Sequence, residues 1–362
     1  NLRNMKIFKE NESILREDVR DIYLEIGGTL KVIEGSSFLI SGGVGFIGSY
    51  FMDLLKFCND NIFMESVTAI CVDNFVTGVP ERIGHIRHNE NFMFLNADIS
   101  KPIEIDYDID YIINAASIAS PSYYRKYPIE TLETNVLGLK NLIELGMKKN
   151  IKSFLNLSSS EIYGDPDESH IPTGEDYNGN VSCTGPRACY DESKRLGETM
   201  VVNYYKEYKV PIKSARPFNV YGPGLMLNDK RVIPDFFNDA IHKRKIQILS
   251  DGTPTRSFCY ISDAVKGFML VLLSEFDGEA FNIGNDRTEI SMKGLAELIA
   301  GIVGNVAIEY KKSKEKDYLT DNPQRRCPDL SKAKSYLNYY PKVELEAGLG
   351  RLYQWYKQES NI

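Results

Sequence analysis

From Ser37 onward, short apolar runs alternate with longer stretches whose apolar residues recur at helical spacing, and this alternation limits the fold more than any other feature. The apolar runs that we predict as buried strands are Ser37–Ser41, Val67–Asp73, Phe92–Ala97, Tyr111–Ala116 and Ser153–Leu157. The segments that we predict as intervening helices are Phe46–Cys58, Ile129–Lys149 and Ala188–Tyr208. Strands that alternate with helices build a parallel sheet covered on both faces. The pattern therefore predicts an α/β fold with a doubly wound parallel sheet.

The chain of 362 residues is long enough for two domains. Residues 1–35 are polar and charged with apolar residues at roughly helical spacing, which predicts one amphipathic helix outside the main fold, packed against it. Residues 36–218 carry the alternating pattern. Beyond Gly222 this pattern loosens, so we assign 219–362 mainly to a smaller substrate-binding domain and expect 256–285 to return to the first domain.

Composition narrows the classes of partner. A formal net charge of −7 disfavours nonspecific binding to nucleic acid or to an anionic membrane, although a local group of arginines can still hold an anionic substrate. No apolar run reaches the roughly 18 residues of a membrane span. The six cysteines form no CxxC pair, so we expect reduced thiols in a cytoplasmic protein. The four histidines form no metal-ligand pattern, and we expect no metal.

A glycine-rich turn directly follows the first predicted strand. Gly42, Gly45 and Gly48 stand in a GxxGxxG spacing, and Phe46 and Ile47 open the helix that follows. Glycines at such a turn allow a tight reversal, close approach of a pyrophosphate to the backbone, and close packing of helix on strand. The N–H groups at the start of the helix then face the pyrophosphate. In its β-α-β context, the turn predicts a dinucleotide-binding Rossmann domain.

An acidic residue, Asp73, ends the second predicted strand. A carboxylate there accepts the ribose 2′-hydroxyl of NAD and repels the 2′-phosphate of NADP, so we predict NAD as the cofactor. Asp98 and Ile99 suit the adenine edge, and Ala115, Ala116 and Ser117 present small side chains where the cofactor passes. The remaining residues that we assign to the cofactor are Asn74, Phe75, Thr77, Gly78 and Val220.

A tyrosine followed four residues later by a lysine occurs four times, so this spacing alone identifies no site. The pairs are Tyr190/Lys194, Tyr205/Lys209, Tyr310/Lys314 and Tyr353/Lys357. Only the first lies at a suitable distance after a strand that ends in hydroxyl residues, and we assign the other three to the surface. We predict that Tyr190 removes a substrate hydroxyl proton as hydride leaves for the nicotinamide. The Lys194 ammonium favours the phenolate, and Ser159 hydrogen-bonds the same substrate oxygen.

The motifs around this pair resemble those of the extended short-chain dehydrogenase/reductase family, also called the NAD-dependent epimerase/dehydratase family. The segments SSSEIYGDP, EDYNGN and GPRACYDESKR are most similar to those of its UDP-glucuronate decarboxylases. Further matching segments are SGGVGFIGS, VDNFVTG, ASIASPSYY, RPFNVYGPG, NDKRV, TRSFCYISD and DNPQRRCPD. The resemblance covers the chain from about Ser37 to its end. It implies an NAD-dependent enzyme that oxidises C4 of a UDP-sugar, and a homodimer in which the Tyr190 helix joins a four-helix bundle.

The residues after Ser159 bear on the reaction that follows the oxidation. Dehydratases of the family usually carry an Asp-Glu pair where this chain has Ser160 and Glu161, and 4-epimerases usually carry a small or neutral residue in place of Glu161. The triplet instead resembles the Thr-Ser-Glu of the decarboxylases. The resemblance therefore implies loss of CO2 from UDP-glucuronate through a 4-keto intermediate, giving UDP-xylose or the 4-keto pentose. A 4-epimerase, a 4,6-dehydratase and a non-catalytic NAD-binding scaffold remain as alternatives.

The resemblance also implies roles for individual side chains. Glu161 takes part in the proton transfers, Arg326 meets the sugar carboxylate, and Ser160 helps to hold that group. Further residues that the resemblance places around the substrate or its diphosphate are Asn219, Arg231, Arg256, Ser120 and Tyr124. Two positions depart from the family pattern: Cys327 stands where a lysine is common, and Gly224 stands where an arginine is often found. Both departures remove positive charge.

Overall fold

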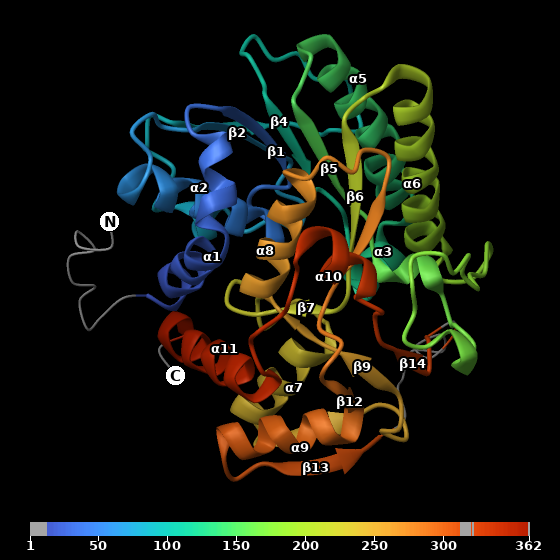
Figure 1. Cartoon of the computed structure of the whole chain (residues 1–362). Helices are drawn as coiled ribbons and strands as arrows, with labels where there is room; N and C mark the ends of the chain where they lie inside the picture. The colour runs from blue at the N-terminus through green and yellow to red at the C-terminus, as the bar shows by residue number, and fades with distance from the viewer. Residues whose placement is uncertain (1–12, 312–319, 321, 361–362) are drawn as a thin grey trace.

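A seven-stranded parallel sheet forms the centre of the molecule (Figure 1). The computed structural model describes residues 13–311, 320 and 322–360. In sheet order the strands are β11 (Ala280–Ile283), β6 (Ile212–Pro217), β5 (Ser153–Leu157), β4 (Tyr111–Asn114), β1 (Ser37–Ser41), β2 (Thr68–Asp73) and β3 (Phe92–Asn96). The chain order reverses between β1 and β4, and ligands of doubly wound sheets bind at such a switch point. The predicted α/β Rossmann fold is confirmed.

Helices cover both faces of this sheet. The helices α2 (Phe46–Asn61) and α8 (Ile261–Leu272) pack on one face, and α5 (Leu139–Lys149) and α6 (Ala188–Tyr208) pack on the other. Side chains of β1 alternate accordingly: Phe38 and Ile40 belong to one buried core, whereas Leu39 belongs to the other. Burial on both faces explains why these strands read as continuous apolar runs.

The predicted elements correspond closely to the observed ones. All five predicted strands and all three predicted helices are present, with ends within three residues of the prediction. The helix predicted over 129–149 is a succession of α4 (Pro128–Glu133), the π-helical turn η4 (Thr134–Gly138) and α5. Strands β6 and β11 were missing from the prediction. Lys213 and Arg216 interrupt the apolar pattern of β6, although both are buried in the fold.

The second half of the chain builds a smaller lobe below the sheet in Figure 1 and also returns to the sheet through α8 and β11. Its strand pairs are β7 (Val220–Tyr221) with β10 (Cys259–Tyr260), and β8 (Lys245–Ile248) with β13 (Ala307–Tyr310). A further sheet contains β12 (Glu289–Ser291), β9 (Thr255–Ser257) and β14 (Arg325–Arg326). Its helices are α7 (Val232–Lys243), α9 (Met292–Val303) and α11 (Leu345–Ser360), whereas α10 (Ser331–Leu337) packs on β11 and α8. Short helices elsewhere are α3 (Pro121–Lys126), η2 (Lys31–Ile33), η3 (Pro80–Ile83), η5 (Ser160–Tyr163) and η6 (Glu168–His170).

The predicted N-terminal helix, α1 (Ile14–Leu30), is part of the main fold. It packs on α2 and α8, and its apolar face joins the larger core. Asp18 is fully buried and accepts hydrogen bonds from the hydroxyls of Tyr50 and Tyr260 and from Arg351 of α11. The interpretation of this helix as lying outside the main fold is therefore wrong. Its apolar face is buried in the larger core, and Asp18 links it by hydrogen bonds to α2 and α11. Residues 1–12 of the predicted extension lie outside the described residues.

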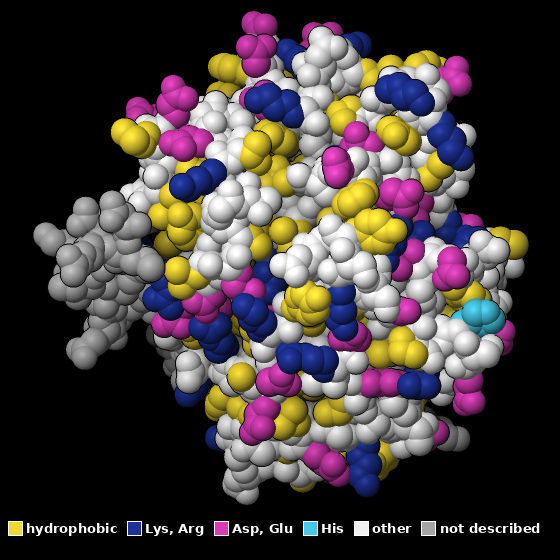
Figure 2. Space-filling view, in the orientation of Figure 1, with side chains coloured by type: hydrophobic (Ala, Val, Ile, Leu, Met, Phe, Trp, Pro, Cys, Tyr) yellow, Lys and Arg dark blue, Asp and Glu magenta, His cyan; other side chains and the backbone are white. Residues whose placement is uncertain are grey.

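The surface mixes both signs of charge. Figure 2 shows acidic and basic side chains interspersed over the visible face, without a broad area of one sign. In the described part of the chain, no helix combines the length and the apolar character that crossing a membrane requires.

Candidate active site

The glycine turn between β1 and α2 leaves no room for side chains. Gly42 has a φ of +70°, and a Cβ added there would lie 2.7 Å from the backbone of Ala116. A Cβ on Gly48 would lie 2.0 Å from the carbonyl oxygen of Gly42. Helix α2 begins at Phe46 with Gly45 as its N-cap, and no side chain caps its first N–H groups. The turn therefore fits a pyrophosphate, which would accept hydrogen bonds from these N–H groups.

Asp73 lies at the end of β2 beside this turn. Its carboxylate accepts the backbone N–H groups of Val44 at 3.2 Å and Phe75 at 2.9 Å. Burial raises the pKa of Asp73, and the same two N–H groups oppose that rise. Gly78 lies against the carboxylate, because a Cβ added there would be 3.1 Å from Oδ1. Asn74, Phe75 and Thr77 belong to the same loop, so the predicted ribose acid and its neighbours form one group at the cofactor turn.

The small residues after β4 also lie at the turn. Ala115, Ala116 and Ser117 follow the strand that pairs with β1, and the backbone of Ala116 packs directly on Gly42. The hydroxyl of Ser117 donates to Asn135 Oδ1 at 2.8 Å, which ties this segment to the helix region before α5. Their position agrees with the expectation that the cofactor passes close to the backbone here.

The two residues assigned to the adenine edge differ in their surroundings. The carboxylate of Asp98 accepts the N–H of Ser100 at 2.9 Å and remains half-buried after β3. The side chain of Ile99 instead packs in the core against Gly138, and its carbonyl accepts a hydrogen bond from Asn141. Any contact of Ile99 with a cofactor is therefore restricted to its backbone N–H.

Tyr190 and Lys194 occupy the first turns of α6, and both are buried. The Lys194 Nζ lies 5.7 Å from the centroid of the Tyr190 ring and donates to the carbonyl of Leu157 at 2.8 Å. Burial raises the pKa of Tyr190 to about 12, opposed by its hydrogen bond with Ser159. Burial lowers the pKa of Lys194 to about 8, opposed by Glu198. The structure thus brings the predicted hydroxyl, phenol and ammonium groups together.

The other tyrosine–lysine pairs differ from this one in burial. Lys209 and Lys357 are exposed, and each stacks on the ring of its own partner, Tyr205 or Tyr353. Lys314 lies outside the described residues. Among the pairs that the structure describes, burial therefore singles out Tyr190/Lys194.

Glu161, in η5, is held by two arginines. Its carboxylate accepts hydrogen bonds from Arg326 of β14 and from Arg187, the N-cap residue of α6. Burial works to raise the pKa of Glu161, but the two guanidinium groups lower it to about 2. Sequence reasoning assigned Glu161 and Arg326 but missed Arg187. Its place three residues before Tyr190, one helical turn earlier, was the signal that could have identified it.

More charged groups surround this carboxylate. Arg256 lies close enough to Arg326 that burial and this like charge together lower the pKa of Arg256 to about 9. Asp191 pairs with Arg187 at 3.5 Å, and burial together with the charge of Glu161 raises the pKa of Asp191 to about 7. Arg326 Nε has no hydrogen-bond partner among the described residues. Three buried arginines around two carboxyl groups leave an excess of positive charge, which favours an anionic substrate.

Two predicted substrate residues lie on α3 and its cap. The ring of Tyr124 is buried and stacks on Tyr190, with centroids 5.2 Å apart and an angle of 14° between the planes. The hydroxyl of Ser120 donates to the carbonyl of Asp229 at 2.6 Å. Tyr124 therefore supports the Tyr190 ring, whereas Ser120 holds the loop that carries Arg231.

The remaining predicted substrate residues come from the strand β7 and the loop before α7. The guanidinium of Arg231 pairs with Asp229 at 2.9 Å and lies 5.7 Å from the centroid of the Phe46 ring, at the start of α2. The side-chain amide of Asn219, which has a φ of +39°, donates to the carbonyl of Ser257 in β9, and Val220, predicted to contact the cofactor, begins β7. These residues therefore lie between the cofactor turn and the strand that carries Arg256.

The two positions that depart from the family pattern differ in their surroundings. Gly224 has a φ of +90°, and a Cβ added there would lie 3.1 Å from Arg82 Nε. The guanidinium of Arg82 therefore lies beside this position, and its charge is paired with the Asp53 carboxylate at 2.5 Å. Cys327 is buried. His85 pairs with Asp53 at 2.8 Å, and within the described ranges no three potential ligands gather into a metal site.

Comparison with known proteins identifies the family of the chain. Residues 38–284 match the NAD dependent epimerase/dehydratase family. The chain belongs to that family. A relative named UDP-glucuronic acid decarboxylase 1 from Arabidopsis thaliana is 39% identical over 316 residues, which cover 87% of this chain and 68% of the relative. A relative of the same name from Danio rerio is 37% identical over 353 residues, which cover 95% of this chain and 80% of the relative.

Solved structures of this family share the fold over most of their length. An epimerase from Methanothermobacter thermautotrophicus superposes with a TM-score of 0.80 at 27% identity, covering 94% of this chain and 97% of that one. A UDP-glucuronic acid 4-epimerase from Bacillus cereus, solved with UDP-glucuronic acid and NAD, gives a TM-score of 0.72 at 25% identity, covering 89% and 99%. The predicted cofactor, NAD, is the cofactor of the family.

Proposed function

We propose that this enzyme decarboxylates UDP-glucuronate through a 4-keto intermediate, a carbon–carbon lyase reaction. The observation that carries the proposal is the position of Glu161, whose carboxylate is held by Arg187 and Arg326 in the same site as Tyr190. A group of arginines suited to a carboxylate thus adjoins residues suited to the oxidation of a sugar hydroxyl. The relatives named UDP-glucuronic acid decarboxylase support the same substrate.

The first step is oxidation at C4. NAD supplies the hydride acceptor when bound, returns the hydride at the end, and carries a cationic ring in its oxidised form. Tyr190 takes the proton of the C4 hydroxyl. Because burial keeps Tyr190 as a phenol at neutral pH, nearby positive charge must lower its pKa, and the Lys194 ammonium lies one helical turn away. Ser159 donates to the same substrate oxygen and fixes its position.

The second step is loss of CO2 from C5. The C4 ketone makes the sugar a β-keto acid, so the electrons of the breaking bond move onto the C4 oxygen, where Tyr190 and Ser159 donate hydrogen bonds. Arg326, with Ser160, holds the carboxylate before it leaves. Glu161 is ionised at neutral pH, so it first takes up from water the one proton that the net reaction consumes and then delivers it to C5. Return of the hydride to C4 gives UDP-xylose, and release before that step gives the 4-keto pentose.

The nucleotide end of the substrate is assigned to Asn219, Arg231 and Arg256. Arginine guanidinium groups match phosphate oxygens in geometry and charge. Arg231 lies over the Phe46 ring at the start of α2, and Arg256 lies near Arg326. This arrangement supports a diphosphate between the cofactor turn and the arginines around Glu161.

The test is incubation of the enzyme with NAD and UDP-glucuronate, followed by mass spectrometry of the nucleotide sugars. We expect loss of CO2 and a UDP-pentose or 4-keto pentose product. Parallel incubations with dTDP-, GDP- and CDP-sugars define the nucleotide preference. Unchanged UDP-glucuronate would reject the proposal.

A second candidate function is 4-epimerisation of UDP-glucuronate. It is favoured by the structural likeness to the Bacillus cereus 4-epimerase that was solved with this nucleotide sugar. An epimerase product has the same mass as the substrate, whereas decarboxylation removes CO2. The same mass spectra therefore separate the two reactions, and chromatography identifies an epimer.

We also propose a homodimer. The helix α6 and the α4–η4 segment, which pack on each other, present large exposed apolar side chains: Leu196 (46% exposed), Ile129 (60%), Leu132 (37%) and Leu137 (46%). Two such faces brought together form a four-helix bundle that buries these side chains. Because all six cysteines are free thiols, we assign the enzyme to the reducing cytoplasm.

A further inference from the structure

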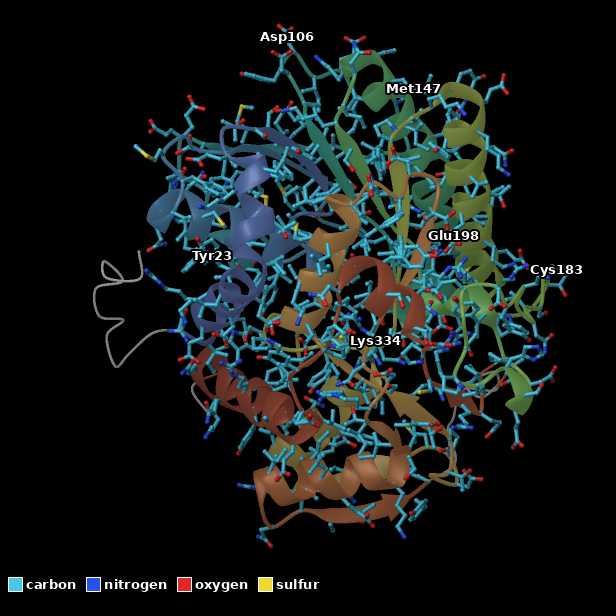
Figure 3. All side chains as sticks on the ribbon, viewed as in Figure 1. Tyr23, Asp106, Met147, Cys183, Glu198 and Lys334 are labelled. Carbon is cyan, nitrogen blue, oxygen red and sulfur yellow. The ribbon has the colours of Figure 1, made fainter. Side chains whose placement is uncertain are left out.

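Behind the proposed catalytic residues, buried polar and charged side chains form a chain of hydrogen bonds that the mechanism does not use. It starts at Glu198, one helical turn after Lys194 on α6; Figure 3 labels this residue. The Glu198 carboxylate accepts the hydroxyl of Ser158 at 2.5 Å. It also accepts Arg216 of β6 through Nε at 2.9 Å and Nη2 at 2.6 Å. The pair is therefore a bidentate ion pair, whose side chains are only 11% and 13% exposed.

The chain continues from Arg216 through Tyr163 to Asn282. Arg216 Nη1 donates to the Tyr163 hydroxyl at 2.6 Å, and that hydroxyl donates to Asn282 Oδ1 at 2.7 Å. Tyr163 and Asn282 are 1% and 0% exposed. Both polar functions of the phenol are thus satisfied by protein groups. We call Glu198, Arg216, Tyr163 and Asn282 the rear network.

The rear network touches each segment that carries a proposed catalytic residue. Tyr163 ends the short helix η5, which also contains Glu161. Asn282 Nδ2 donates to the carbonyls of Thr173 at 2.9 Å and Asp329 at 3.1 Å. The N–H of Thr173 in turn donates to the carbonyl of Cys327, the residue after Arg326, at 2.9 Å. Glu198 itself lies beside Lys194, so one network reaches the redox pair, Glu161 and Arg326.

The negative charge of Glu198 in the rear network also affects the pKa of Lys194. Burial lowers the pKa of this lysine, and the carboxylate of Glu198 is the group that opposes the shift. The bidentate contact with Arg216 fixes how close that carboxylate lies to the ammonium. A carboxylate and a guanidinium that are shielded from water and hydrogen-bonded to each other are held in one relative geometry, because any other geometry would leave a charge without its partner.

We propose that Glu198, Arg216, Tyr163 and Asn282 are positioning residues that keep Glu161 and Arg326 in register with Tyr190 and Lys194. This inference rests on the proposed function. Decarboxylation and return of the hydride act on adjacent sugar carbons, so both groups of residues must stay aligned on one ring. The rear network supplies that alignment, which retains the keto intermediate until it is reduced. Its members act through the residues of the site rather than on the sugar.

The first test replaces Tyr163 by Phe, which keeps the ring in place and removes the hydroxyl between Arg216 and Asn282. A displacement near 1 Å at a reacting centre can cost roughly 100-fold in rate, so we expect about a ten-fold rise in the fraction of 4-keto pentose released. Each released molecule leaves one NADH, which is measured by its absorbance. The matched control is Tyr339→Phe, because Tyr339 is fully buried and donates to the carbonyl of Gly284 at 2.8 Å.

The control should lose stability without changing the ratio of 4-keto pentose to UDP-xylose. If Tyr163→Phe and Tyr339→Phe lower the melting temperature alike and neither changes this ratio, the rear network has only a structural role and the inference is overturned.

The second test replaces Glu198 by Gln, which preserves volume and an acceptor for Arg216. Loss of the negative charge lowers the pKa of Lys194, so the high-pH limb of kcat should move down by about one pH unit. Glu192→Gln is the control, since Glu192 lies on the same helix, its side chain is 38% exposed and it pairs with Arg195. A limb that stays in place in Glu198→Gln overturns the inference. Wild-type enzyme that leaves UDP-glucuronate unchanged instead overturns the proposed function.

Discussion

At the scale of single residues, the pKa values of two neighbouring carboxyl groups are shifted in opposite directions. Arg187 and Arg326 hold the pKa of Glu161 at about 2 despite its burial, whereas burial and the charge of Glu161 raise that of Asp191 to about 7. Two acidic groups whose environments separate their pKa values can serve different proton-transfer roles. The sequence places them 30 positions apart, so only the fold brings them together around Arg187.

Replacing Tyr190 by Phe removes the proposed base and leaves its stacking on Tyr124. We expect kcat to fall by roughly 100- to 10,000-fold, the usual contribution of a general acid or base, while NAD affinity stays within about two-fold. Steady-state kinetics and calorimetric titration with NAD measure the two quantities. Tyr205→Phe, at a surface pair on the same helix, should change neither. Undiminished turnover in Tyr190→Phe would contradict the assignment.

Replacing Arg187 by Gln removes one of the two cations that hold the Glu161 carboxylate. Since Arg187 lowers the pKa of Glu161, its loss raises that pKa. Because the proposed reaction needs ionised Glu161, the variant loses its activity on acidification at a higher pH than the wild type does. The acidic limb of kcat/KM should therefore move up by about one pH unit or more. The control is Arg287→Gln, because Arg287 is an exposed arginine whose ion pair, with Glu344 at 2.9 Å, lies at the surface. An unmoved acidic limb would show that Arg187 does not set this ionisation.

At the scale of elements, β1 and α2 meet at a junction where the surrounding backbone leaves no space for a side chain on Gly48. Gly48→Ala would place a Cβ 2.0 Å from the carbonyl oxygen of Gly42, so strand and helix must separate. We expect a loss of roughly 1–3 kcal/mol in the free energy of unfolding, typical of overpacking, together with loss of NAD binding. Gly301→Ala on α9 is the control, since nothing lies within 4 Å of an added Cβ there and alanine favours a helix. Chemical denaturation and NAD titration of both variants test this.

Helix α1 depends on a buried acid. Burial raises the pKa of Asp18 to about 7, although Arg351, Tyr50 and Tyr260 oppose the rise. An acid whose pKa is higher in the folded state stabilises the fold when protonated, and this contribution is lost as pH rises from its unfolded value near 4 to about 7. The free energy of unfolding of the wild type should therefore fall relative to Asp18→Asn by up to roughly 4 kcal/mol between about pH 4 and pH 8. Urea denaturation at several pH values measures it, and a constant difference would contradict the prediction.

At the scale of the whole molecule, the exposed apolar side chains of α6 and α4 form the surface through which we propose that two copies of the chain dimerise. Leu196→Glu places a charge in the proposed four-helix bundle, so we expect the dimer to dissociate at micromolar concentration, with a loss of affinity of at least about ten-fold. Leu24→Glu is the matched control, because Leu24 is an exposed leucine on α1, outside the proposed interface. Analytical ultracentrifugation gives the mass of each variant. A wild type that sediments as a monomer would refute the dimer.

Much of the fold and part of the site follow from the sequence alone. The alternation after Ser37 predicts the parallel sheet, because buried strands and amphipathic helices have different apolar periods. The GxxGxxG turn and Asp73 predict the cofactor site, because the ligand of such a turn contacts backbone and sequence-local groups. The motif that contains Tyr190 and Lys194 likewise lies within one helix, whose geometry sets their separation.

Other features depended on the tertiary structure. Four tyrosine–lysine pairs share one spacing; the sequence favours Tyr190/Lys194 by its place after the strand that ends in hydroxyl residues, but only the structure shows that both of its side chains are buried. The ionisation of Glu161 depends on Arg326, 165 positions away, and the burial of Asp18 depends on Arg351, 333 positions away. Local sequence determines backbone conformation and the ligands of a single turn. The pKa and the partner of a buried charge depend on the residues that the fold packs around it. Residues adjacent in the sequence do not specify that packing.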